Sequence, residues 1–242
     1  MNNIVSLRFI KTFGLILFIV MMFNMSLKNN NDVLSSYDIP VCMSLYSSVI
    51  IYPIIPYIYI KHLRSYQNVN CLIRYGSINR IWFKSCMDAL LKATELTLMI
   101  AVSGFVTNAV VSDSVFNWND KESIFCRITF SRIEMAPSIW EIMLPVIVFC
   151  FLNILLIELV TLVTYWYINM YWIGYAFVVV GYTLPSIPGF KYSLNRMCIA
   201  YEDMLVLDSI KPIWVEKAVV LVGSICIMIL VGLVRKRKDF IR

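Results

Sequence analysis

Residues 138–184 read SIWEIMLPVIVFCFLNILLIELVTLVTYWYINMYWIGYAFVVVGYTL, and this apolar stretch decides the fold class of the chain. A single helix of that length would extend about 70 Å at ~1.5 Å per residue, more than twice the ~30 Å of a bilayer hydrocarbon core. Tyr165-Trp166-Tyr167 and Tyr171-Trp172 resemble interfacial aromatic residues on either side of a tight turn. The stretch therefore predicts two membrane helices, Ser138–Tyr165 and Tyr171–Leu184, with a break near Asn169.

Four further apolar stretches, each flanked by polar residues, predict the remaining spans: Phe9–Leu27, Val41–Ile60, Cys86–Val111 and Ile213–Val234. The composition agrees, since 60% of the residues are hydrophobic and only 15% are charged. In soluble domains about 45–50% of the residues are apolar and about 25% are charged. The longest segments between spans have about 25 to 30 residues, too few to bury a core of their own. We therefore predict one all-α domain over residues 1–242, a polytopic membrane protein with six transmembrane helices.

The distribution of basic residues indicates that both termini are cytoplasmic. Of the 21 Lys and Arg residues, 13 fall before or at the start of the first span, between the second and third spans, at the start of the third span or after the sixth. A five-span or seven-span chain would place Arg235–Lys238 outside, against the positive-inside rule. Topology thus explains the net charge of +6 without a nucleic-acid partner. For Arg235–Lys238 a stop-transfer anchor is favoured over a site for membrane lipid, which stays open.

The first apolar stretch is interpreted as a retained span. Arg8 and Lys11 precede Phe13–Phe23 as in a secretory signal, but no small-x-small cleavage site follows. We therefore expect a multi-pass protein of the cell membrane.

The chain lacks the motifs of an enzyme or a metal protein. It contains no GxxxxGK[ST], HExxH, GxSxG or glycine-rich dinucleotide turn, so we predict no catalytic residue and no cofactor within it. The seven cysteines show no CxxC spacing, and His62 is the only histidine, so no metal site is expected. Cys126 and Cys198 both fall on the predicted outer side. Unpaired thiols are favoured there, and a bridge stays open.

The inner segment Lys61–Ser85, KHLRSYQNVNCLIRYGSINRIWFKS, is long, basic and aromatic enough to dock a partner. Gly76-Ser77 marks a turn, and Ile78–Lys84 has the pattern of an interfacial helix. A loop that only satisfies the positive-inside rule is the equally weighted alternative.

Polar residues within the predicted spans are few. Asp88, Lys92 and Glu95 are spaced i, i+4 and i+7, so they share one helix face and can pair in sequence. Because a charge at the bilayer centre costs about 2.5–3.5 kcal/mol, this stripe either lies at headgroup level or forms a subunit contact or conduit wall. Asn153 and Glu158 in the fourth span are interpreted as interhelical hydrogen-bonding residues worth about 0.6–2 kcal/mol.

Proline and glycine mark two backbone features. Pro53 and Pro56 remove backbone donors from the second span and predict a kink there. Gly174 and Gly181 lie on one face of the fifth span and predict close approach of a neighbouring helix.

Three places resemble one family: CLIRYGSINRIWFKS at Cys71–Ser85, the aromatic turn Tyr167–Tyr175, and the basic tail VRKRKDFI at Val234–Ile241. With the six-span layout, they are similar to the small permease subunits of type-2-like ABC exporters that accompany bacteriocin, lantibiotic and other peptide gene clusters.

The resemblance implies a separate ATP-binding subunit that uses ATP and Mg²⁺, and a second permease chain of the same or another kind. It implies an ATPase-coupling loop formed by Arg74, Tyr75, Gly76, Ser77 and Arg80. The few interior polar groups favour a hydrophobic or amphipathic peptide or a lipid-like substrate. The alternatives are a non-transport immunity or scaffold protein and, less favoured because nucleophile–base pairs are missing, a lipid-modifying membrane enzyme.

Overall fold

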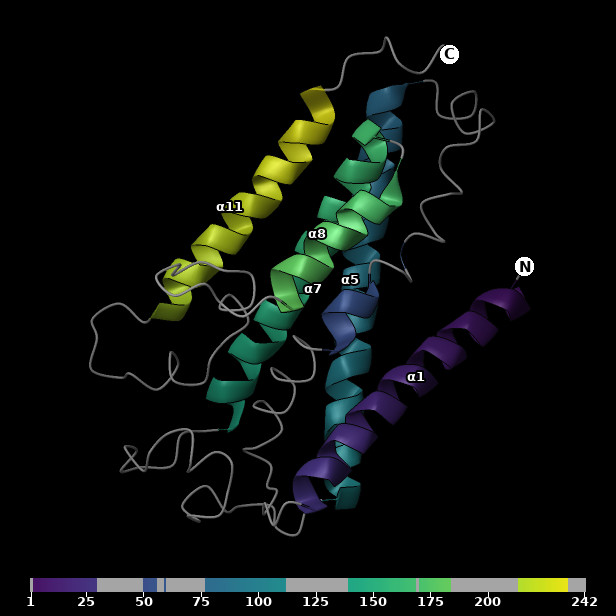
Figure 1. Ribbon diagram of the computed structural model, residues 1–242, viewed down its shortest axis with the longest axis vertical. Helices are drawn as coiled ribbons and strands as arrows, with labels where there is room; N and C mark the ends of the chain where they lie inside the picture. Colours follow the sequence, from purple (N-terminus) through teal and green to yellow (C-terminus); the bar gives the residue numbers. More distant parts are fainter. Residues whose placement is uncertain are drawn as a thin grey trace. The chain divides into compact units, whose positions relative to one another are not determined.

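The computed structural model describes residues 2–29, 50–55, 59, 77–111, 139–168, 170–183 and 213–234, and their regular structure is entirely helical (Figure 1). A short helical segment covers residues 50–55. The five long helices are α1 (Asn2–Asn29), α5 (Ile78–Val111), α7 (Ile139–Ile168), α8 (Tyr171–Thr183) and α11 (Ile213–Val234). The all-α prediction is confirmed for this part of the chain.

Three of the described helices are long and apolar enough to cross a membrane, within Ile78–Thr107, Met143–Ile168 and Val215–Val234. Two shorter apolar segments occur, at Ile10–Met25 in α1 and Trp172–Gly181 in α8. This supports the membrane assignment. The count of six spans and the cytoplasmic placement of the termini stay predictions.

Helix α5 begins well before the predicted third span. Ile78–Lys84, expected as an interfacial helix, forms the first turns of α5 and continues without a break into Cys86. No Pro or Gly interrupts the sequence INRIWFKSCM, so nothing in it ends the helix. Hydropathy marks where the apolar stretch begins, whereas the helix begins where Ser77 caps it. At ~1.5 Å per residue, α5 is longer than the hydrocarbon core is thick.

The long apolar stretch is divided into two helices at its aromatic turn. α7 ends at Ile168 and α8 begins at Tyr171, so the break lies at residues 169–170. Both sides of this break carry bulky aromatic side chains, including the exposed Tyr167 and Trp172. Trp172 packs edge-on against Tyr175 one turn into α8, with ring centroids 5.9 Å apart.

The chain forms two compact units. The first contains α1, α5 from Leu96 onward and α7 up to Cys150. The second contains α5 up to Glu95, α7 from Phe151, α8 and α11 from Glu216. Trp82, the charged residues of α5 up to Glu95, and Glu158 all belong to the second unit.

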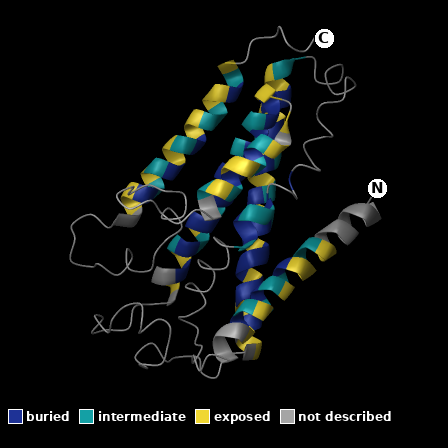
Figure 2. Cartoon of the chain, viewed as in Figure 1, coloured by how far each residue is buried: buried dark blue, intermediate teal, exposed yellow. Residues whose placement is uncertain are grey.

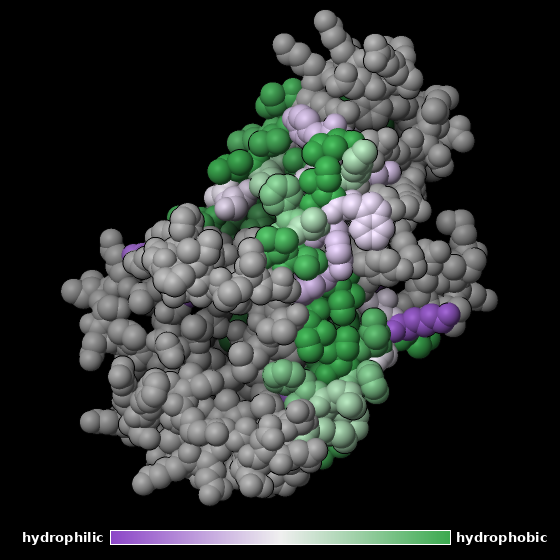
Figure 3. Space-filling view, in the orientation of Figure 1, coloured by the Kyte–Doolittle hydropathy of each residue, from purple (hydrophilic) through white to green (hydrophobic). Residues whose placement is uncertain are grey.

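Large apolar side chains are exposed along the long helices, as expected for surfaces that face lipid. Examples are Phe18 on α1, Leu98 on α5 and Leu230 on α11, each more than half exposed. α11 shows few buried turns (Figure 2), and the described side chains on the face in Figure 3 are mainly apolar. In water so much exposed apolar surface would be unfavourable, whereas in a bilayer it contacts lipid tails.

Candidate functional site

Trp82 joins three helices at one end of the second unit. Its side chain is 1% exposed, and its indole Nε1 donates a hydrogen bond to the backbone carbonyl of Ile229 on α11 at 3.1 Å. Its ring lies 5.4 Å, centroid to centroid, from the ring of Trp166 on α7, tilted by 52°. Gly232 leaves the space that the indole fills, because a Cβ there would overlap the ring. We call Trp82, Trp166, Ile229 and Gly232 the Trp82 cluster.

A second contact lies near the Trp82 cluster. The hydroxyl of Tyr167 at the end of α7 donates to the backbone carbonyl of Val231 on α11. The start of α5 therefore lies beside the ends of both α7 and α11, so α5 runs antiparallel to the other two.

Ser77 caps the start of α5, next to the predicted coupling loop. The backbone N–H of Arg80 donates to Ser77 Oγ at 3.3 Å, and the N–H of Ile81 donates to the Ser77 carbonyl at 3.3 Å. Arg80 is exposed, one turn from the cap. The other three members of the predicted loop, Arg74, Tyr75 and Gly76, lie outside the described residues.

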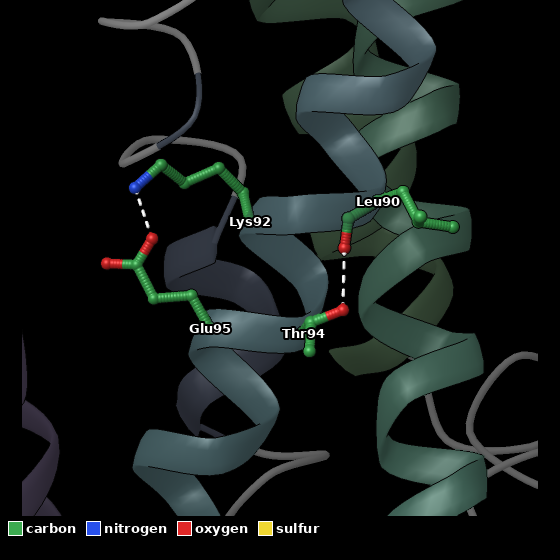
Figure 4. Close-up of polar contacts among 4 residues, drawn as sticks. All are labelled: Leu90, Lys92, Thr94 and Glu95. Atoms are coloured by element: carbon green, nitrogen blue, oxygen red, sulfur yellow. Dashed lines mark hydrogen bonds and ion pairs between the residues drawn. The ribbon is translucent and has the colours of Figure 1, made fainter.

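The charged stripe of α5 is arranged as two pairs along the helix. Lys84 Nζ lies 3.2 Å from Asp88 Oδ1, with the Lys84 side chain 46% exposed and that of Asp88 12% exposed. Lys92 forms an ion pair with Glu95 (Figure 4), and both side chains are partly exposed. Lys84 belongs to the predicted inner segment Lys61–Ser85, and its pairing with Asp88 was not predicted. The i, i+4 spacing of Lys84 and Asp88 is the sequence signal that could have identified this pair.

Glu158 lies in the most enclosed part of α7. Residues 153–159 are all buried, and the exposed fractions of Asn153 and Glu158 are both 0%. Neither carboxylate oxygen of Glu158 has a hydrogen-bond partner among the described residues. Glu158 was expected to hydrogen-bond to a neighbouring helix, but no residue in the described part of the chain is a hydrogen-bond partner for it. Burying an ionised, unpaired carboxylate costs several kcal/mol, so the burial of Glu158 requires another explanation.

Within the described ranges, three ionisable groups lie near enough to act electrostatically with Glu158. Lys92 and Glu95 approach it from α5, and the buried Tyr59 from the segment that contains the predicted second span. Lys92 and Glu95 of the charged stripe on α5 and Glu158 on α7, which are far apart in the sequence, thus belong to one electrostatic cluster.

Gly174 allows α8 to approach α7 closely, as predicted. A Cβ at Gly174 would overlap Thr164 Oγ1 and would lie 3.1 Å from the Cα of Thr161. Both threonines direct their hydroxyl groups to their own helix, Thr161 to the Ile157 carbonyl at 2.8 Å and Thr164 to the Val160 carbonyl at 2.8 Å. Gly181 is half-buried.

The remaining predicted features are partly described. Pro53 is half-buried in the helical segment at 50–55, and Pro56 lies outside the described residues, so the kink stays a prediction. His62, Cys126 and Cys198 also lie outside. Among the cysteines within the described ranges, Cys86, Cys150 and Cys226 form no disulfide. No group of three metal-ligating side chains occurs in the part of the chain that the structure describes.

The first unit has a polar contact that the sequence analysis did not identify. Asn24 Nδ2 on α1 donates to Thr107 Oγ1 on α5 at 2.9 Å, and both side chains are buried. Thr107 Oγ1 in turn lies 2.7 Å from the carbonyl oxygen of Ser103. The ends of α1 and α5 therefore lie together, so these two helices run parallel.

Replacing Thr107 by valine is expected to reduce the free energy of unfolding by about 0.6–2 kcal/mol, because Asn24 loses its interhelical acceptor. Thr94→Val is the matched control, since the exposed Thr94 bonds the Leu90 carbonyl of its own helix at 2.9 Å (Figure 4). Equilibrium unfolding by SDS in mixed micelles, followed by circular dichroism, measures both. Equal losses in the two variants would show that the bond to Asn24 contributes nothing.

Comparison with protein-family models, with curated proteins and with solved structures finds no match for this chain.

Proposed function

We propose that this chain is the membrane-spanning permease subunit of an ATP-driven exporter of the ABC type. ATP and Mg²⁺ would be bound by a separate ATP-binding subunit, and a second permease chain, identical or different, would complete the path. The proposed substrate is a hydrophobic or amphipathic peptide or a lipid-like molecule. The proposal includes six spans, with both termini in the cytoplasm.

The observation that carries the proposal is the continuity of α5 from its cap to the middle of the second unit. The Ser77 cap stands at the edge of the proposed coupling loop, and α5 runs on without interruption to Val111. Trp82, one turn after the cap, links α5 to α7 and α11. A displacement of the loop by a closing ATPase would therefore move three helix ends together, which is what coupling requires.

Contacts between helices support the proposed six-span topology. With a cytoplasmic N-terminus, the third span begins inside while the fourth and sixth end inside, and the Trp82 cluster joins these three ends. The first and third spans both end outside, in agreement with the contact between Asn24 and Thr107. If the chain did not cross the membrane between α7 and α11, the C-terminal ends of these two helices would lie on opposite faces of the membrane. The bond between Tyr167 and Val231 opposes that arrangement.

The apolar character of the helices supports the proposed substrate class. The paired charges on α5 and the buried polar groups of α7 are few beside the apolar side chains of the second unit. A path lined in this way is better suited to an apolar molecule than to an ion or a sugar.

The test is a detergent pull-down of the tagged chain from its native membranes, with ATPase activity measured in the eluate. Wild type is expected to recover a stoichiometric ATPase, and Arg74→Glu combined with Arg80→Glu is expected to lose it, because the loop charges are reversed. Arg8→Glu combined with Lys11→Glu is the matched control, since it reverses two inner basic residues away from the loop.

Loss of the ATPase in both double variants would contradict a specific role for the loop. Recovery of no ATPase by wild type would overturn the proposal in favour of an immunity or scaffold protein. In the recovered complex, ATPase activity should rise with an added hydrophobic peptide. A response only to a polar solute would contradict the proposed substrate class.

A further inference from the structure

We propose that Glu158 is a proton-binding site inside the membrane domain, holding its side chain as a neutral carboxylic acid at neutral pH. The inference is independent of ATP-driven export, because it rests on the surroundings of one side chain of this chain alone.

The first reason is burial without compensation. Glu158 is fully enclosed, in a run of seven buried residues, and neither carboxylate oxygen receives a hydrogen bond from any described residue. A buried carboxylate is tolerated when cations or N–H donors surround it, and otherwise it takes up a proton. The bound proton forms an O–H bond at one carboxylate oxygen and comes from water, so no other reactant is needed.

The second reason is that Lys92, the cation found near Glu158 within the described part of the chain, is engaged elsewhere. Lys92 lies close enough to act electrostatically on Glu158, yet it forms its ion pair with Glu95 on its own helix. Glu95 is itself an acid near Glu158, so its charge opposes a second negative charge there. The phenol of Tyr59 also acts electrostatically with Glu158, and it carries no positive charge.

A proton fits this site better than a metal ion. A hard cation such as Ca²⁺ takes six to eight oxygen ligands, and Mg²⁺ requires octahedral coordination. Among the described residues no three metal-ligating side chains gather, at Glu158 or elsewhere. A proton needs a single oxygen atom, which Glu158 provides.

The arrangement also defines when the proton leaves. If Lys92 moved from Glu95 to Glu158, the ionised carboxylate would gain a cationic partner and the proton would be released. Glu158 is therefore protonated while Lys92 is paired with Glu95, and it is ionised when that pair is broken. Because Lys92 lies on α5, a movement of α5 relative to α7 would change the protonation of Glu158.

The test is chemical labelling of the purified full-length chain in lipid nanodiscs with dicyclohexylcarbodiimide. This apolar reagent modifies protonated carboxyl groups in apolar surroundings, and peptide mass spectrometry locates the adduct. At neutral pH we expect Glu158 to be labelled and Glu95, which is partly exposed and paired with Lys92, to be unlabelled. Glu158→Gln is expected to lose this label alone, since the amide resembles the neutral acid in shape.

The decisive variant is Glu95→Gln, which releases Lys92 from its ion pair. Labelling of Glu158 is expected to fall severalfold, because free Lys92 then stabilises the ionised carboxylate. Thr94→Val, at the neighbouring position, is the control and should leave labelling unchanged. An unlabelled Glu158 in the wild type would overturn the proposal, as would labelling that persists unchanged in Glu95→Gln. Protection of Glu158 from labelling by Na⁺ or Ca²⁺ at constant pH would show that the site binds a metal ion. That result would also overturn the proposal.

Discussion

Replacing Trp82 by alanine is expected to lower the free energy of unfolding by about 3–5 kcal/mol, the range for removing a large aromatic side chain from a packed interior. The indole fills space between α5, α7 and α11, where it meets Trp166, the Ile229 carbonyl and the backbone at Gly232. The variant also loses the contact with Trp166, for which aromatic pairs contribute about 0.5–1.5 kcal/mol, and the hydrogen bond to Ile229.

Phe83→Ala is the matched control for Trp82→Ala. Phe83 is the next residue of the same helix and is 55% exposed, so its removal leaves no cavity. We expect a change within about 0.5 kcal/mol, as for substitutions away from packed sites. SDS-induced unfolding in mixed micelles measures both variants. Similar losses for Trp82→Ala and Phe83→Ala would show that the Trp82 cluster does not hold the three helix ends together.

Replacing Gly232 by alanine is expected to destabilise the protein by about 1–3 kcal/mol, the cost of overpacking an interior. A Cβ at this position would overlap three atoms of the Trp82 six-membered ring, and the ring is fully enclosed. Gly223 lies on the same helix with no atom within 4 Å of a Cβ. Gly223→Ala is therefore expected to stabilise α11 by about 0.5–1 kcal/mol, because alanine loses less backbone entropy than glycine in a helix.

A second substitution distinguishes steric overlap from any other effect at Gly232. Trp82→Phe removes the part of the indole that a Cβ at 232 would strike. In a double-variant cycle, Gly232→Ala should cost less in the Trp82→Phe background than in wild type. Additive losses would mean that the two residues do not touch.

The helices and their apolar character were predictable from the sequence because they depend on local composition. Helix α11 has the bounds of the predicted sixth span, and the break between α7 and α8 falls at the predicted aromatic turn. The start of α5 was not predictable from hydropathy. The polar first turns of a capped helix lie beyond the apolar stretch, so an apolar window begins later than the helix does.

The candidate site was predictable only as separate residues. Asp88, Lys92, Glu95 and Glu158 stand out in a hydrophobic sequence because charges are rare there. Their partners do not stand out. Lys84 was assigned to the inner segment although it pairs with Asp88, and Glu158 was interpreted as a hydrogen-bonding residue although no described residue bonds to its oxygens.

The sequence by itself determined that this is a helical membrane protein with long apolar helices, because helix formation and partition into hydrocarbon depend on neighbouring residues along the chain. Tertiary structure alone decided that Trp82 meets the carbonyl of Ile229, 147 residues away, and that Glu158 is enclosed without a hydrogen-bond partner among the described residues. Such contacts depend on which faces of the helices come together. In a membrane helix every face is apolar, so hydropathy does not distinguish the face that packs from the face that meets lipid.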